Sequence, residues 1–152
     1  MVILVDTGPL VAYLDRGDPA HEFVRFGWEP IAGRFVTTTA VFTEAMHFLR
    51  PVQNGAETLV DLFREGSLML EDVFQLPMLG RATKLMARYP NVSMDFADAS
   101  LVVLAEALNT PNILTLDERG FRTFRYRRNK LVIPAHGPAV RRALETSAST
   151  FP

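Results

Sequence analysis

The chain opens with a short, continuously apolar run that ends in a carboxylate. Residues 2–5, Val-Ile-Leu-Val, are rich in β-branched side chains and lead directly into Asp6-Thr7-Gly8-Pro9. An apolar run without polar alternation predicts a strand covered on both faces, as in a parallel sheet. Pro9 suits the first turn of a helix. Thr7 or Gly8 can provide its N-cap, and Asp6 itself could also do so. The opening therefore predicts a buried strand, a carboxylate and then a helix.

The same alternation continues along the chain. Further strands are predicted at residues 34–39, 67–73, 112–117 and 131–134, and further helices at 21–26, 40–50, 57–66, 77–90, 93–109 and 138–145. Strands that alternate with helices imply crossover connections, a parallel sheet and helices on both of its faces. We therefore expect a three-layer α/β/α sandwich with a central, mainly parallel sheet.

Length and composition limit the other possibilities. A chain of 152 residues fits one domain, and we assign residues 1–135 to it, with 136–152 as an extension of a short helix and a frayed tail. The absence of cysteine excludes thiol catalysis, disulfides and cysteine-based zinc sites. The net charge of -1 argues against a uniformly basic nucleic-acid binder but permits a local basic patch. With no apolar run near the ~18 residues of a membrane span and no signal-peptide pattern, we expect no membrane association and a cytoplasmic protein.

Acidic residues occupy related places in these predicted elements. Asp6 and Asp117 end predicted strands, Asp98 lies in the first turn of a helix, and Glu44 lies one turn into another, beside an apolar face that includes Phe48. In parallel α/β sheets the carboxyl ends of the strands and the amino ends of the helices meet at one edge. The four carboxylates are therefore predicted to converge.

Converging carboxylates need protons or a bound cation to offset their mutual repulsion. Ligation by oxygen alone favours Mg²⁺ or Mn²⁺ over zinc or copper. Such a cation can activate water and stabilise the charged transition state of phosphodiester hydrolysis. These residues therefore predict a metal-dependent phosphoryl hydrolase.

Four stretches, in this order and spacing, resemble the PIN-domain nucleases, in particular the toxins of VapC-type toxin-antitoxin pairs: VDTGPLVAYL, TTTAVFTEAMHFL, MDFADASLVVLAEAL and ILTLDERGF. The resemblance covers nearly the whole chain. It implies an acidic quartet that binds Mg²⁺ or Mn²⁺ for endoribonuclease activity, made of Asp6, Glu44, Asp98 and Asp117. It also implies that Thr7 and Thr115 are the small hydroxyl residues near that site.

The resemblance further implies an RNA substrate, a homodimer, and a cognate antitoxin protein that blocks the active site. Two alternatives stay open from the residues themselves. The chain could be a non-catalytic PIN-like module that binds RNA or protein, or a housekeeping PIN nuclease that acts on ribosomal RNA or DNA.

Two other features lie near the predicted site. Asp95 precedes Asp98 by one turn, and its position favours helix capping over metal ligation, so we place it beside the site. A basic stretch interleaved with Phe121, Phe124 and Tyr126 follows Asp117, and it suits RNA binding through phosphate contacts and base stacking. Alternatively the rings are core and the arginines are only solvated. The basic residues in question are Arg119, Arg122, Arg125, Arg127, Arg128 and Lys130.

Overall fold

The computed structural model of the chain describes residues 1–127 and 129–130. Strands β1 (Val2–Val5), β2 (Arg34–Thr38), β3 (Met69–Glu71) and β4 (Ile113–Leu114) form one sheet in the order β3-β2-β1-β4, with every pair parallel. The register sets Leu4 of β1 opposite Val36 of β2 and Ile113 of β4. Strand β1 is therefore central, and its carboxyl end lies between those of β2 and β4.

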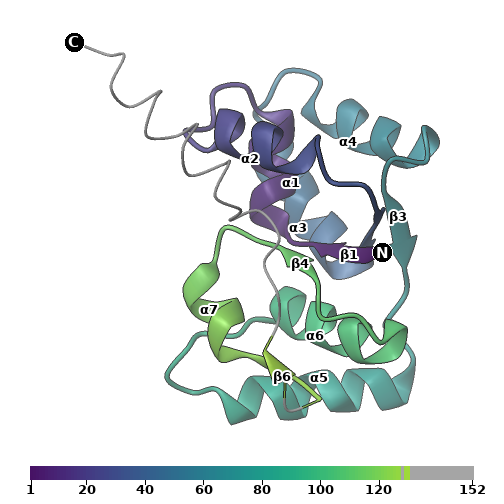
Figure 1. The fold of residues 1–152 in the computed structure, drawn as a ribbon, viewed down its shortest axis with the longest axis vertical. Helices are drawn as coiled ribbons and strands as arrows, with labels where there is room; N and C mark the ends of the chain where they lie inside the picture. The colour runs from purple at the N-terminus through teal and green to yellow at the C-terminus, as the bar shows by residue number, and fades with distance from the viewer. Residues whose placement is uncertain (128, 131–152) are drawn as a thin grey trace.

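Helices cover both faces of this sheet. Figure 1 shows α1 (Thr7–Leu14), α2 (His21–Trp28), α3 (Thr39–Leu49) and α4 (Gly55–Arg64) gathered on one side. On the other side are α5 (Leu76–Arg88), α6 (Phe96–Leu108) and α7 (Glu118–Thr123), followed by a small antiparallel pair, β5 (Arg125–Tyr126) and β6 (Asn129–Lys130). The predicted three-layer α/β/α sandwich is confirmed.

The core lies between β1 and the helices packed on it. Ile3, Leu4 and Val5 have no exposed surface, as expected for a strand covered on both faces. Helix α6 contacts β1 and β2, while α5 packs on α6. Every residue from Ala97 to Ala105 in α6 except Asp98 is buried, which explains why this stretch is apolar on nearly every side. None of the helices in the described part of the chain combines the length and the apolar character that a bilayer crossing needs.

Several local predictions differ from the structure. Capping of α1 by Thr7 or Gly8 is wrong, whereas the alternative of capping by Asp6 is confirmed: the helix begins at Thr7, and the Asp6 carboxylate accepts the Thr7 N–H. Helix α7 is not among the helices that the sequence predicts. Phe48, predicted on the core face of its helix, is 52% exposed. The strand at 131–134, the helix at 138–145 and the extension at 136–152 lie outside the described residues.

Candidate active site

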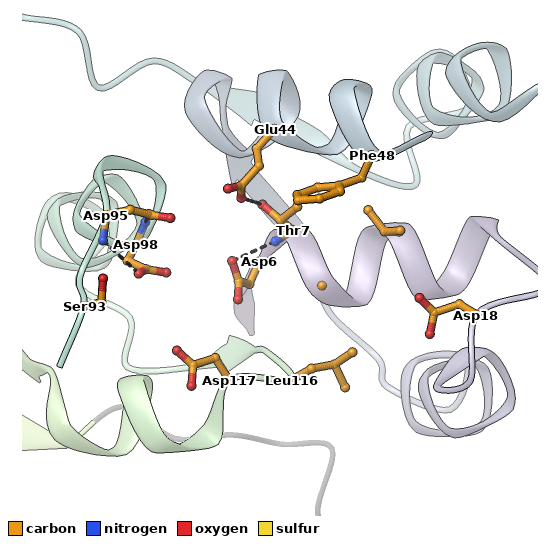
Figure 2. A pocket seen from close by; sticks show the side chains of 12 residues that line it. Asp6, Thr7, Asp18, Glu44, Phe48, Ser93, Asp95, Asp98, Leu116 and Asp117 are labelled. Carbon is orange, nitrogen blue, oxygen red and sulfur yellow. Dashed lines mark hydrogen bonds between the residues drawn. The ribbon is translucent and has the colours of Figure 1, made fainter. Parts of the chain in front are cut away.

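The four predicted acidic residues line one cavity at the carboxyl end of the sheet. Asp6 follows β1 and Asp117 follows β4, two neighbouring parallel strands. Glu44 reaches the cavity from α3, and Asp98 reaches it from the first turn of α6. The cavity has a volume of about 660 Å³. Figure 2 shows these side chains around a common space, although they come from four separate segments of the chain.

Asp6 is the most deeply buried of these carboxylates, with 7% of its surface exposed. Its Oδ1 accepts the Thr7 N–H at 2.7 Å, and its Oδ2 accepts the Thr115 hydroxyl at 2.8 Å. Burial raises the pKa of Asp6 to about 6, and the charges of Glu44 and Asp95 add to the rise, while the two hydrogen bonds oppose it. A fraction of this group therefore holds its proton near neutral pH.

Two buried threonines connect the carboxylates. The Thr7 hydroxyl donates to Oε2 of Glu44, while the Thr7 backbone N–H donates to Asp6. The Thr115 hydroxyl donates to Asp6 and accepts the backbone N–H of Asp117 at 3.0 Å. Thr7 therefore links Asp6 to Glu44, and Thr115 links Asp6 to Asp117. These hydrogen bonds orient the Asp6 and Glu44 side chains without adding charge.

Asp98 and Asp95 form a reciprocal cap at the start of α6. The Asp98 N–H donates to Oδ1 of Asp95 at 2.9 Å, and the Asp95 N–H donates to Oδ2 of Asp98 at 3.2 Å. Burial is the main cause that raises the pKa of Asp98 to about 8, followed by the charges of Asp95 and Asp6 and, more weakly, Asp117. Asp95 has the capping position that the sequence predicts, and its exposed carboxylate also lines the cavity.

Asp117 combines a cavity position with a cap. Its Oδ1 accepts the Gly120 N–H at 3.0 Å and so begins α7. A Cβ atom at position 120 would collide with Oδ2 of Asp117 and come within 3.3 Å of the Phe124 ring. At position 120, only glycine therefore allows the Asp117 carboxylate to keep its observed position.

The donor set fits a hard divalent cation. All the candidate ligands are carboxylate oxygens, the type that Mg²⁺ and Mn²⁺ prefer. A cation would also favour the ionised forms of Asp6 and Asp98, whose pKa values are raised by burial first and by neighbouring acidic charges second. Within residues 1–127 and 129–130, no three acidic or histidine side chains already form a group that could hold an ion. In proteins Mg²⁺ usually takes one or two carboxylates directly and keeps several waters, so an acidic cavity suits it without direct contact from every carboxylate.

The basic stretch after Asp117 has mixed roles. Phe121 and Phe124 have no exposed surface and Tyr126 is 5% exposed, so the idea that these rings stack on RNA bases is wrong and the core alternative holds for them. Arg122 pairs with Glu118 at 2.6 Å. Arg119 is exposed on α7. Arg128 and the side chain of Lys130 lie outside the described part of the chain.

Two of the arginines bind backbone carbonyls at the ends of helices. One Nη of Arg125 donates to the carbonyls of Arg122, Thr123 and Phe124 at the end of α7. Arg127 donates to Oδ1 of Asn109 and to the Glu106 carbonyl at the end of α6. Cations in these positions satisfy unpaired carbonyls and complement the helix dipole. The side chains of Arg125 and Arg127 therefore stabilise the ends of α7 and α6.

Sequence reasoning missed several residues of this region. Asp18, Phe48, Ser93 and Leu116 also line the cavity, although only folding brings them there. An adjoining cavity of about 560 Å³ has a mostly apolar lining that includes Phe74 and Phe96, and it shares Glu44, Phe48 and Asp95 with the first. The sequence held one sign of the helix that follows Asp117: Gly120 lies three residues after it, a spacing that allows the Asp117 side chain to cap the helix.

Comparison with known proteins agrees with this geometry. The PIN domain family model matches residues 3–125. Ribonuclease VapC26 of Mycobacterium tuberculosis is 29% identical over 128 residues, which cover 81% of this chain and 92% of that relative. The crystal structure of M. tuberculosis VapC20, described as a sarcin-ricin loop cleaving toxin, aligns with a TM-score of 0.70 at 20% identity, over 76% of this chain and 90% of that one.

A second solved structure is VapBC2 from Rickettsia felis, bound to a DNA fragment from their promoter. It aligns with a TM-score of 0.53 at 13% identity, over 78% of this chain and 90% of that chain. At these identities the two structures bear on the fold alone. The family model, by contrast, spans most of the sequence and includes all four acidic positions. This protein therefore belongs to the PIN domain family.

Proposed function

We propose that this protein is a divalent-metal-dependent endoribonuclease that acts as the toxin of a toxin-antitoxin pair. The observation that carries the proposal is the convergence of Asp6, Glu44, Asp98 and Asp117 on one cavity in a chain of the PIN domain family. The names of the relatives support the substrate and the role, since one is a ribonuclease and another is described as a sarcin-ricin loop cleaving toxin.

The carboxylates would hold Mg²⁺ or Mn²⁺, with Asp6 and Asp98 as the main ligands because their burial and mutual repulsion favour a counter-cation. When bound, the cation supplies a positive charge that stabilises the phosphoryl transition state and lowers the pKa of water. Thr115 and Thr7 hold the Asp6 carboxylate in one orientation, and Thr7 also orients Glu44. Asp117 completes the acidic rim from the start of α7.

The same acidic rim controls how RNA can approach. A phosphodiester is negatively charged, so carboxylates without a counter-cation would repel it. Exposed cations outside the cavity would then guide the strand toward it. Arg119 is the best placed of the described candidates, because it is exposed, lies two residues after Asp117, and has no cap to maintain.

The proposal extends to partners and setting. From the resemblance to VapC-type toxins, the protein would form a homodimer and would be blocked by a cognate antitoxin, and we expect it to act in the cytoplasm. The apolar cavity around Phe48 and Phe74, which are 52% and 41% exposed, offers the kind of surface that such protein contacts cover.

The test is cleavage of a mixed, partly structured RNA pool by the purified protein, with Mg²⁺, with Mn²⁺ and with a chelator. We expect cuts that require the cation and that Asp98→Asn reduces by at least ~100-fold, because a ligand that also shapes the site is lost. Asp61→Asn is the matched control, because Asp61 pairs with Arg64 on α4 and does not line the cavity.

Cleavage by Asp98→Asn at the wild-type rate would refute the assignment of the site. Cation binding without any RNA cleavage would instead favour a non-catalytic binding module. Calorimetric titration with Mn²⁺ alongside the cleavage assay separates these outcomes, since it reports on the acidic site without requiring the correct RNA.

A further inference from the structure

Two buried hydroxyls join the helices that carry Glu44 and Asp98. Thr38 ends β2 and caps α3, and Ser100 lies in the first turns of α6. Their hydroxyl oxygens are 2.7 Å apart, and neither residue has any exposed surface. They are 62 residues apart in the sequence, so this contact forms only when α6 packs against the end of β2.

The direction of the hydrogen bonds follows from their partners. The Ser100 hydroxyl lies 2.7 Å from the Ala97 carbonyl, which can only accept, so Ser100 donates its proton there. Ser100 must therefore accept from the Thr38 hydroxyl, and Thr38 in turn accepts the Val41 N–H at 3.2 Å. The result is a one-way chain from Val41 through Thr38 and Ser100 to Ala97, in which every group has a partner.

Both ends of this chain lie next to the acidic cavity. Val41 is three residues, about one helical turn, before Glu44. Ala97 directly precedes Asp98. Helices α3 and α6 also contact each other directly. The hydroxyl chain therefore ties the first turn of the Glu44 helix to the first turn of the Asp98 helix at a point inaccessible to water.

We propose that Thr38 and Ser100 are positioning residues that set the separation of Glu44 and Asp98 and thereby the cation affinity and turnover of the site. This inference rests on the proposed function. Hydrogen bonds are directional, whereas apolar contacts tolerate small shifts, so a buried hydroxyl pair specifies the relative position of two helices more narrowly than packing alone. Partners that orient ligating carboxylates commonly affect cation affinity by about 10- to 100-fold when removed.

The test compares four purified variants by Mn²⁺ titration, by RNA cleavage kinetics and by urea unfolding. Ser100→Ala removes the link and should weaken Mn²⁺ binding about tenfold and lower kcat, with little change in the KM for RNA. Thr38→Ser keeps the hydroxyl and should retain affinity within about twofold. Thr38→Val combined with Ser100→Ala removes both hydroxyls and also leaves the Val41 N–H without its cap, so it should lose more stability than Ser100→Ala alone and bind Mn²⁺ no more tightly than that variant.

Thr110→Val is the matched structural control. The Thr110 hydroxyl is also buried and donates to a carbonyl, that of Val2, but it lies at the opposite end of β1 from Asp6. This variant should lose stability as Ser100→Ala does, with wild-type Mn²⁺ affinity and kcat. If Ser100→Ala and Thr110→Val lost Mn²⁺ affinity equally, the loss would follow from lower stability in general, and the proposal would be overturned.

The remaining outcomes are also decisive. Wild-type affinity and kcat in Ser100→Ala would overturn the positioning role while leaving the nuclease assignment intact. A wild-type protein that neither binds Mn²⁺ nor cleaves RNA would overturn the proposed function, and the positioning role with it. A loss of affinity in Thr38→Ser equal to that in Ser100→Ala would show that the hydroxyl is not the active feature.

Discussion

Gly120 controls the position of a neighbouring carboxylate without contacting the cavity itself. The Asp117 side chain folds over position 120 to accept its N–H, and a methyl group there would collide with Oδ2. A substitution at this position can therefore displace Asp117 while leaving its charge in place. Replacing Asp117 itself would change the charge and the geometry together.

We expect Gly120→Ala to lower RNA cleavage by roughly tenfold, because displaced groups around a cation site commonly cost 10- to 100-fold. Circular dichroism and urea unfolding should show a folded protein, since alanine favours helix over glycine by ~1 kcal/mol and partly offsets the collision. The measurement is kcat/KM on the cleaved RNA.

Gly80→Ala provides the control for this substitution. Gly80 lies within α5, and an added Cβ there would meet nothing within 4 Å. This change should stabilise the protein by roughly 0.5–1 kcal/mol and leave cleavage unchanged. If Gly120→Ala behaved like Gly80→Ala, the position of Asp117 would be irrelevant to the reaction.

At the level of elements, the arginines in and just after α7 have different roles. Arg125 and Arg127 donate to backbone carbonyls at helix ends, whereas Arg119 is exposed. Arginines of one short segment thus differ in role: Arg125 and Arg127 stabilise helix ends, and Arg119 is the one that we propose for RNA binding. Sequence alone gives these residues equal weight.

We expect Arg119→Gln to weaken RNA binding and to reduce the slope of log affinity against log salt by about one unit or less, as for the loss of one phosphate contact. Its free energy of unfolding should stay within ~0.5 kcal/mol of wild type, because an exposed side chain with no cap is replaced. Arg125→Gln should instead lower stability by ~1 kcal/mol, since it leaves carbonyls of α7 without their donor.

Fluorescence anisotropy at several salt concentrations and urea unfolding measure the two effects. Arg16→Gln is a charge-matched control on an exposed residue after α1. It should change neither the salt slope of RNA affinity nor the free energy of unfolding. A salt slope that changes for Arg125→Gln but not for Arg119→Gln would contradict the division.

The elements that sequence predicts well are those whose burial is uniform. Strand β1 and helix α6 are apolar on nearly all sides, and both were predicted because the core surrounds them. Helix α7 was missed because its six residues are too few for a periodic pattern and its stability depends on Asp117 and Arg125 as caps. Phe48 was misplaced because its helix face borders a cavity instead of the core.

The candidate site shows the same division. The convergence of Asp6, Glu44, Asp98 and Asp117 on one cavity follows from parallel topology, which the alternating pattern predicts. The link between Thr38 and Ser100 could not be predicted, because it depends on how deeply α6 settles against β2. Serine and threonine near helix starts are common, and only packing decides which of them meet.

For the molecule as a whole, the acidic cavity makes stability depend on pH in an unusual direction. Burial raises the pKa of Asp6 to about 6 and that of Asp98 to about 8, from an ordinary value of 3.8. At a pH between 3.8 and the folded pKa of each group, the carboxyl group has lost its proton in the unfolded chain but keeps it in the folded protein. The free energy of unfolding contributed by these groups is therefore complete below pH 3.8 and is lost as pH rises through the folded pKa values.

We expect the cation-free protein, measured by urea unfolding with a chelator present, to lose stability from pH 5 to pH 8. Asp98→Asn should lose less over the same range, because its amide does not ionise, whereas Asp61→Asn should follow the wild type. Saturating Mn²⁺ should restore the stability lost at pH 8, since the cation replaces the protons. The same decrease in wild type and Asp98→Asn would contradict this origin.

The hydrogen bond from Thr115 to Asp6 spans 109 residues, and the acidic residues extend from position 6 to position 117. A ribosome making this protein must therefore translate most of the chain before the last carboxylate can join the first. Until then the growing polypeptide carries an incomplete acidic site. On the proposed function, the parallel pairing of β1 with β4 therefore delays nuclease activity until residue 117 has been made and has folded against the first strand.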